Sequence, residues 1–84
     1  MNQPLHIIHT SDVHLHDGDE GARARDAFQH VVDAVVETKP DLFLIAGDLF
    51  DHNRVEGTVV DFVIEQLARV TCPTVIIEIG RAHV

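Results

Sequence analysis

The hydrophobic positions along the chain follow two alternating periods. A short β-rich run occupies residues 5–9, and apolar residues then recur at every third or fourth position from Ala24 to Val35. This spacing places them on one face of a helix, which Pro40 ends. Residues 42–46 form a continuous apolar run closed by Gly47, which predicts a strand buried on both faces.

The same alternation continues in the second half of the chain. A second helical stripe stops before Pro73, and residues 74–77 predict a third strand; the stripe contains Val60, Val63, Ile64, Leu67 and Ala68. Strands separated by helical crossovers are almost always parallel, so the sequence predicts an α/β fold of order β-α-β-α-β. Ligands of such sheets bind beyond the carboxyl ends of the strands.

Composition narrows the chemistry that this fold can carry. The 84 residues include six basic and 14 acidic side chains, a net charge of −8, and seven histidines. The single cysteine excludes an internal disulfide and a cysteine-based zinc cluster, and no apolar run approaches the ~20 residues that span a bilayer. The first residues do not resemble a signal peptide, so a cytoplasmic protein is expected. Carboxylates with imidazoles are the ligand set of a divalent metal site.

Ionisable residues directly follow the first two predicted strands. Asp12 and His14 come after the first strand, and Asp48 comes after the second. Because neighbouring strands lie ~5 Å apart, the three side chains could converge on one cation. On an extended backbone, residues i and i+2 project to the same side, so Asp12 and His14 could bind that cation together. Either aspartate alone could simply cap a turn; their joint placement favours a site.

Two longer stretches carry a family resemblance. Asp12-X-His14, followed by Gly47-Asp48-X-X-Asp51, resembles the calcineurin-like metallophosphoesterases. The flanking residues, 9–15 and 40–51, are similar to the nuclease subunits of the bacterial SbcD and the archaeal and eukaryotic Mre11 type. The resemblance covers residues 5 to 77. It implies the incomplete N-terminal portion of a four-layer α/β/β/α sandwich that binds two divalent metal ions, usually Mn²⁺, with Fe²⁺ or Zn²⁺ compatible with the same ligands.

The resemblance also implies a role for each matching residue. Asp12 and His14 would bind the first metal, and Asp48 would bridge both metals. Asp51 would organise the turn around the site rather than bind metal. His52 lies one residue beyond the position where some relatives have a functional histidine. The reaction implied is two-metal hydrolysis of a phosphoester.

The implied biological role is that of an exonuclease in DNA end processing. Its partners would be DNA, an SbcC/Rad50-type ATPase and a second copy of the same subunit. A phosphatase or phosphodiesterase acting on small molecules is an alternative, because the short motifs are shared across the superfamily. A non-catalytic metal-binding domain is a third possibility. A free-standing DNA-binding module is disfavoured by the net charge of −8.

The last seven residues depart from the family pattern. A Gly-Asn-His signature, which would supply the second metal site, is expected just after Ile77, but the chain reads Glu78 to Val84 instead. One possible back-translation of these seven residues resembles a sequencing-library adapter. We therefore interpret residues 1–77 as the N-terminal part of a metallophosphoesterase domain and residues 78–84 as a non-native tail, and we expect the 84-residue chain to be inactive. A genomic sequence that retains codons 78–84 would contradict this interpretation.

Overall fold

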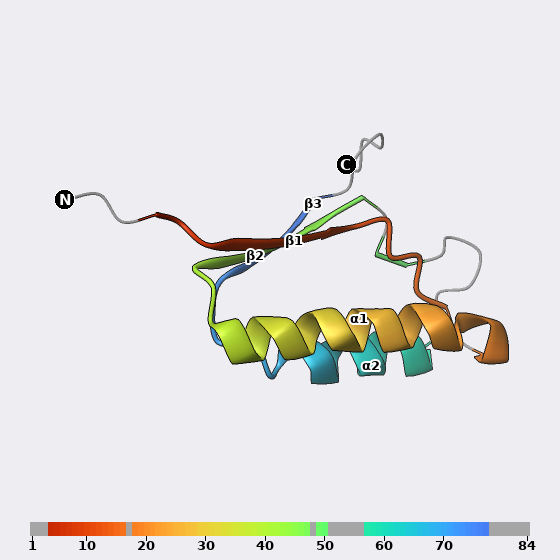
Figure 1. Cartoon of the computed structure of the whole chain (residues 1–84). Helices are drawn as coiled ribbons and strands as arrows, with labels where there is room; N and C mark the ends of the chain where they lie inside the picture. The colour runs from red at the N-terminus through yellow and green to blue at the C-terminus, as the bar shows by residue number, and fades with distance from the viewer. Residues whose placement is uncertain (1–3, 17, 48, 51–56, 78–84) are drawn as a thin grey trace.

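The chain folds as a three-stranded parallel sheet with two helices. The computed structural model describes residues 4–16, 18–47, 49–50 and 57–77. The elements, in chain order, are β1 (Ile7–Ser11), α1 (Gly18–Thr38), β2 (Leu42–Ala46), α2 (Gly57–Leu67) and β3 (Thr74–Ile77) (Figure 1). The predicted β-α-β-α-β order is therefore confirmed.

Pairing with β2 defines which residues form β1. The strands pair in the order β1-β2-β3, with Ile7 opposite Leu42 and Ser11 opposite Ala46. The strand thus occupies residues 7–11 rather than the predicted 5–9. Hydrogen bonds to β2 continue through the polar residues Thr10 and Ser11, which an apolar pattern cannot reveal.

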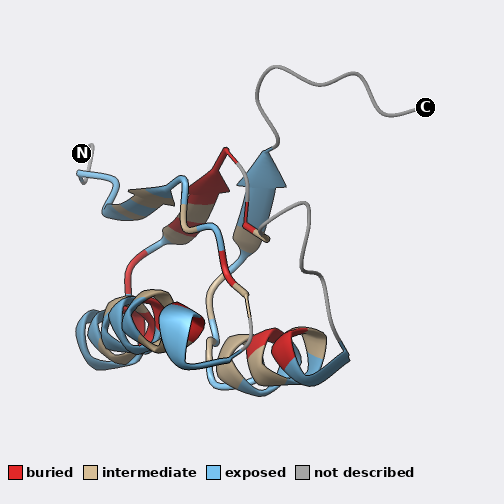
Figure 2. Ribbon diagram, turned by 90° about the vertical axis from the view of Figure 1, so that its right-hand side faces the viewer, coloured by how far each residue is buried: buried red, intermediate tan, exposed pale blue. Residues whose placement is uncertain are grey.

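Both helices lie against the same face of the sheet (Figure 2). The strand order advances in one direction, and two right-handed crossovers in the same direction place their helices on the same side. Ile7, Val75 and Ile77, on the opposite face, remain 41–46% exposed. We refer to the helix-covered side as the covered face and to the other as the open face.

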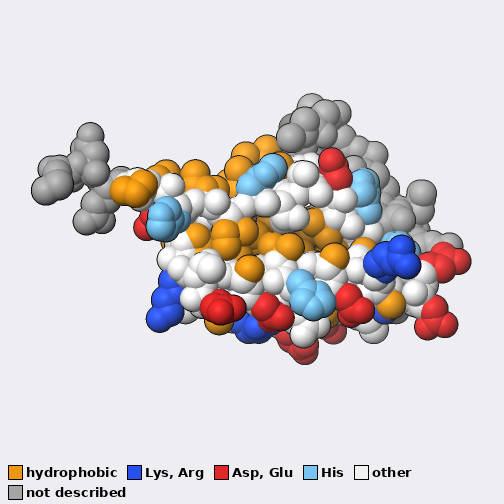
Figure 3. Space-filling model, in the orientation of Figure 1, with side chains coloured by type: hydrophobic (Ala, Val, Ile, Leu, Met, Phe, Trp, Pro, Cys, Tyr) orange, Lys and Arg blue, Asp and Glu red, His pale blue; other side chains and the backbone are white. Residues whose placement is uncertain are grey.

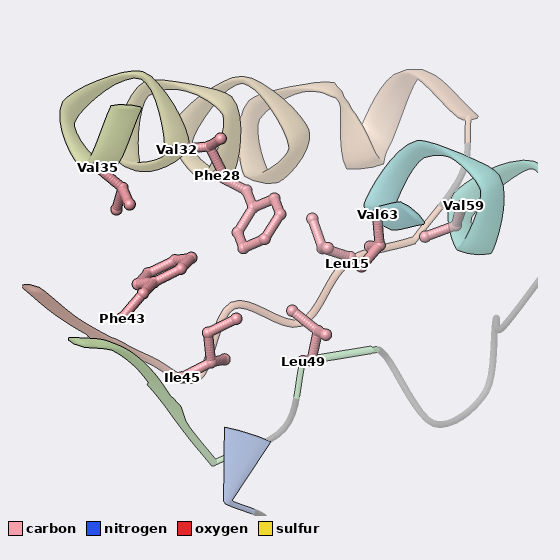
Figure 4. Packing of buried hydrophobic residues seen from close by; sticks show 9 residues of the cluster. All are labelled: Leu15, Phe28, Val32, Val35, Phe43, Ile45, Leu49, Val59 and Val63. Atoms are coloured by element: carbon pink, nitrogen blue, oxygen red, sulfur yellow. The ribbon is translucent and has the colours of Figure 1, made fainter. Parts of the chain in front are cut away.

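The hydrophobic core fills the space between the covered face and the two helices. Nine apolar side chains from all of these layers meet there: Leu15, Phe28, Val32, Val35, Phe43, Ile45, Leu49, Val59 and Val63 (Figure 4). The helical stripe predicted for α1 supplies Phe28, Val32 and Val35, so that prediction is confirmed. The Phe28 and Phe62 rings, 6.3 Å apart between centroids, join α1 to α2.

The prediction that β2 is buried on both faces is wrong. Phe43 and Ile45 are fully buried beneath the helices, whereas Leu42 and Leu44 on the open face are half-buried. A continuous apolar run requires both faces to be shielded, but one-directional crossovers cover only one.

The predicted buried stripe of α2 is also displaced. Val59 and Val63 are buried, whereas Ile64 is 60% exposed. Almost every turn of this helix carries apolar residues on more than one side, so the sequence allows two overlapping stripes. The face that carries Val59 and Val63 is the one buried against the core, and Phe62 on the same helix packs near Phe28 of α1.

Charged side chains line the surface along α1 on the face drawn in Figure 3. Arg69, just beyond α2, reaches across to α1, where its Nη2 atom lies 2.5 Å from Oδ1 of Asp33. No helix in the described part of the chain is long and apolar enough to span a membrane.

Candidate metal centre

The Asp12-X-His14 triplet lies just beyond the end of β1. Asp12 and His14 both adopt the left-handed backbone region, with φ angles of 52° and 53°. The extended backbone that we predicted for this triplet is therefore wrong. Left-handed residues other than glycine are strained, and such residues concentrate at functional sites because the surrounding structure must hold them.

Hydrogen bonds connect the loop after β1 to the loop after β2. The N–H of Asp12 donates to the carbonyl of Ala46 at 3.0 Å, and the N–H of Leu15 donates to the carbonyl of Leu49 at 2.8 Å. Leu15 also pairs with Phe50 in an isolated parallel bridge. In the sequence, His14 lies between the two donors, Asp12 and Leu15, and Asp48 lies between the two acceptors, Ala46 and Leu49. The condition on which the predicted site depends, that the first two strands are neighbours, is thus met for the described backbone.

Gly47 allows the carboxylate of Asp12 to approach the end of β2. Gly47 has a φ of 79°, and a Cβ added there would overlap Oδ1 of Asp12. Its N–H donates to the carbonyl of Ile77 at 2.7 Å, which also fixes it to the end of β3. A side chain at this position would be strained by its φ and would displace the aspartate. Glycine is therefore needed for Asp12 to lie against this backbone.

The two candidate ligands are accessible from solvent. Asp12 and His14 are both exposed, whereas Leu15 between the loops is fully buried and anchors them to the core. A cavity of about 210 Å³ opens beside Asp12, between the end of β1 and α1. Its walls are Thr10, Ser11, Asp12, Val13, Ala24, Ala27, Phe28 and Val31. Asp12 thus contributes both to this hollow and to the contact with Gly47.

Comparison with known protein families matches residues 5–78 to the calcineurin-like phosphoesterases. The chain belongs to this family. Calcineurin-like phosphoesterases are hydrolases and generally bind divalent metal ions, which agrees with the prediction of metal-dependent phosphoester hydrolysis. The fold is consistent with part of the α/β metallophosphoesterase architecture. Comparisons with curated proteins and with solved structures gave no match.

Two of the predicted metal ligands, Asp12 and His14, lie among the described residues. Asp12 supplies carboxylate oxygens and His14 an imidazole, which are donors that Mn²⁺, Fe²⁺ and Zn²⁺ accept. Within residues 4–16, 18–47, 49–50 and 57–77 there is no group of three metal-binding side chains. The other predicted site residues, Asp48, Asp51 and His52, lie outside these ranges.

Sequence reasoning missed two residues that support the loop of the candidate site. Arg25 donates from Nη1 to the carbonyl oxygen of His16 at 2.7 Å, and Gly21 lies directly against the same oxygen. Both lie on α1, and in the sequence neither residue type there indicates a contact with the loop after β1. The predicted helical stripe begins at Ala24, so Gly21 was not predicted to lie inside a helix, where a glycine would have indicated a close approach.

Proposed function

We propose that this chain carries half of the metal site of a metal-dependent phosphoester hydrolase. Asp12 and His14 bind the first divalent ion in this proposal, and Asp48 bridges it to a second. The supporting observation is the pair of backbone hydrogen bonds that joins the Asp12–Leu15 loop to Ala46 and Leu49. These bonds bring together the loops that carry the family's first two motifs, in a chain that matches the family over residues 5–78.

The proposed metal is Mn²⁺, and Fe²⁺ and Zn²⁺ have compatible ligand preferences. Two ions in such a site polarise the phosphate and activate water, so the protein needs chiefly to hold the ligands and the substrate. Asp12 and His14, two residues apart in one strained loop, would hold the first ion. Asp51 would organise the second loop, and His52 would lie within reach of the substrate.

The proposed substrate is DNA, and the proposed role is that of the nuclease subunit in an SbcCD-like end-processing complex. This rests on the similarity of residues 9–15 and 40–51 to that branch of the family. The cytoplasmic location, the SbcC-type ATPase partner and pairing with a second copy belong to the same proposal. Small phosphodiesters or phosphomonoesters are the alternative substrates, since a net charge of −8 adds repulsion toward the DNA backbone.

We further propose that the 84-residue chain is inactive by itself and binds one ion weakly. The 84 residues do not include the Gly-Asn-His signature, which in the family supplies a ligand of the second metal ion and the histidine thought to act as general acid. A single ion held by Asp12, His14 and Asp48 lacks the second positive centre that stabilises the transition state. A non-catalytic metal-binding domain would have the same behaviour.

Calorimetric titration with Mn²⁺ tests this proposal. We expect one bound ion, and a loss of at least about tenfold in affinity in Asp12→Asn and in Asp48→Asn, because each removes a charged oxygen ligand. Asp26→Asn is the matched control, since Asp26 is an exposed aspartate on α1 away from the strand ends. Equal affinity in all four proteins would contradict the site.

The same proteins report on activity when bis-p-nitrophenyl phosphate and linear double-stranded DNA are supplied with Mn²⁺. We expect no turnover by the 84-residue chain. Robust turnover that Asp48→Ala abolishes would contradict the proposed inactivity while supporting the proposed site. Turnover on the small phosphodiester without cleavage of DNA would favour the alternative substrate class.

A further inference from the structure

The loop that carries Asp12 and His14 has an attachment to α1 as well as to β2. Nη1 of Arg25 donates a hydrogen bond to the carbonyl oxygen of His16, nine residues earlier, at 2.7 Å. The contact is partly buried, and both side chains are half-buried. Hydrogen bonds from a charged donor are shorter and stronger than those between neutral groups. Arg25 therefore holds the far end of the loop firmly against the helix.

Gly21 makes this attachment possible from the helix side. It lies one turn before Arg25 and is buried, although glycine is among the least favourable residues inside a helix. A Cβ at this position would overlap the carbonyl oxygen of His16 and would crowd Nη1 of Arg25. The loop thus reaches the helix only because residue 21 has no side chain.

Together the attachments enclose the candidate ligands. The N–H of Asp12 is bonded to Ala46, Leu15 is bonded to Leu49 and buried in the core, and the carbonyl of His16 is bonded to Arg25. His14 lies between these points with a φ of 53°, and Nδ1 of His16 lies 3.2 Å from its carbonyl oxygen. A strained residue keeps such a conformation only where its surroundings restrict it on both sides.

We propose that Arg25 is a positioning residue for the metal site. By holding the carbonyl of His16, it restricts the loop to the conformation in which Asp12 and His14 are available to the same ion. Arg25 does not need to contact the ion or the substrate. The inference rests on the proposed function, since it assigns Arg25 an effect on metal binding at that site.

Mn²⁺ affinity of the 84-residue chain, measured by calorimetry, tests the role of Arg25. We expect Arg25→Ala to weaken binding about three- to tenfold, which is less than the 10- to 100-fold typical of residues bonded directly to a ligand. Arg25→Lys should stay within about twofold, because a lysine ammonium also donates to a carbonyl. Arg23→Ala is the matched control, since Arg23 is an exposed arginine on the same helix.

Gly21→Ala tests the same contact without changing the charge. The added methyl group displaces the carbonyl of His16, so we expect a loss of Mn²⁺ affinity at least as large as in Arg25→Ala. Gly57→Ala is its control, because a Cβ at Gly57 meets nothing within 4 Å. Circular dichroism checks that each variant folds. If Arg25→Ala does not fold, the Mn²⁺ affinities of the two single variants Gly21→Ala and Arg25→Lys test the role of Arg25 instead.

Amide hydrogen exchange in the absence of metal separates this inference from the proposed function. Faster exchange at the Leu15 amide in Arg25→Ala, but not in Arg23→Ala, is the result expected if Arg25 holds the loop. Unchanged exchange together with wild-type Mn²⁺ affinity would overturn the inference. If the unaltered chain binds no Mn²⁺, the proposed function fails, and the exchange data alone then show whether Arg25 restrains the loop.

Discussion

The core and the strand-end loops of this chain follow opposite rules. Between the covered face and the helices, every side chain of the buried cluster is apolar, and all but Leu15 and Leu49 lie on helices or strands. At the ends of β1 and β2, Asp12, His14 and Gly47 all have positive φ angles, and both candidate ligands are exposed. Burial of apolar surface stabilises the first region, and this stability holds the second region in a strained conformation.

This contrast predicts that stability and metal binding can be separated by mutation. Core substitutions should lower the free energy of unfolding without changing the metal affinity of molecules that remain folded. Substitutions at the strand ends should change metal affinity by more than their effect on stability explains. A variant that changes both in proportion would show that the two regions are less independent than their structures indicate.

Phe43→Ala should have the largest effect on stability. Phe43, the second residue of β2, is fully buried, and removal of a buried phenylalanine side chain costs about 3–5 kcal/mol. Leu44→Ala is the matched control, because Leu44 is the next residue of the same strand but lies half-buried on the open face. Urea denaturation followed by circular dichroism measures both. Equal losses would mean that the open face is shielded as well as the covered one.

Gly47→Ala should affect stability less and metal affinity more. An alanine at a φ of 79° costs roughly 1–2 kcal/mol, and its methyl group would also displace the carboxylate of Asp12. We expect a reduced free energy of unfolding and a loss of Mn²⁺ affinity in calorimetry, whereas Gly57→Ala should change neither by much. Wild-type Mn²⁺ affinity in Gly47→Ala would mean that the position of Asp12 against Gly47 is irrelevant to binding.

Asp33→Asn should have the smallest effect. Asp33 pairs with Arg69 across the two helices, but the two side chains are 48% and 38% exposed. Ion pairs this accessible typically contribute about 0.2–1 kcal/mol and weaken with salt. Denaturation at low and high salt measures the difference, and Mn²⁺ affinity should stay unchanged. A loss well above 1 kcal/mol would place this pair among the determinants of the fold.

Much of the fold could be predicted from the sequence, because the period of the hydrophobic residues and the prolines and glycines that end helices and strands are local features of the chain. The stripe around Phe28, Val32 and Val35 has one apolar side, so it has one possible core face, and the structure confirms it. The α2 stripe was misplaced because Val60, Ile64 and their neighbours offer two apolar sides. In the structure, the side that carries Val59 and Val63 joins the core, and Phe62 packs near Phe28.

The candidate site divides in the same way. The positions of Asp12 and Asp48 after apolar runs were enough to single them out as candidate ligands, provided that the first two strands are neighbours, and the sheet order meets that condition. The left-handed backbone of Asp12 and His14 was not predicted, because Asp and His adopt this region more often than other side chains but still only in a small minority of positions. The contacts of Arg25 and Gly21 with His16 join residues whose side chains have no distinctive pattern in the sequence.

The sequence by itself determined the order of the elements, the main core stripe, the family and the residue types at the strand ends. These depend on periodicity, on proline and glycine as breakers, and on short motifs, all of which are read along the chain. Tertiary structure alone decided which face of β2 is covered, which side of α2 is buried and how the loop after β1 is held. Each of these depends on which distant residues come into contact, and that is set by the direction of the crossovers and by the space that Gly21 and Gly47 leave open.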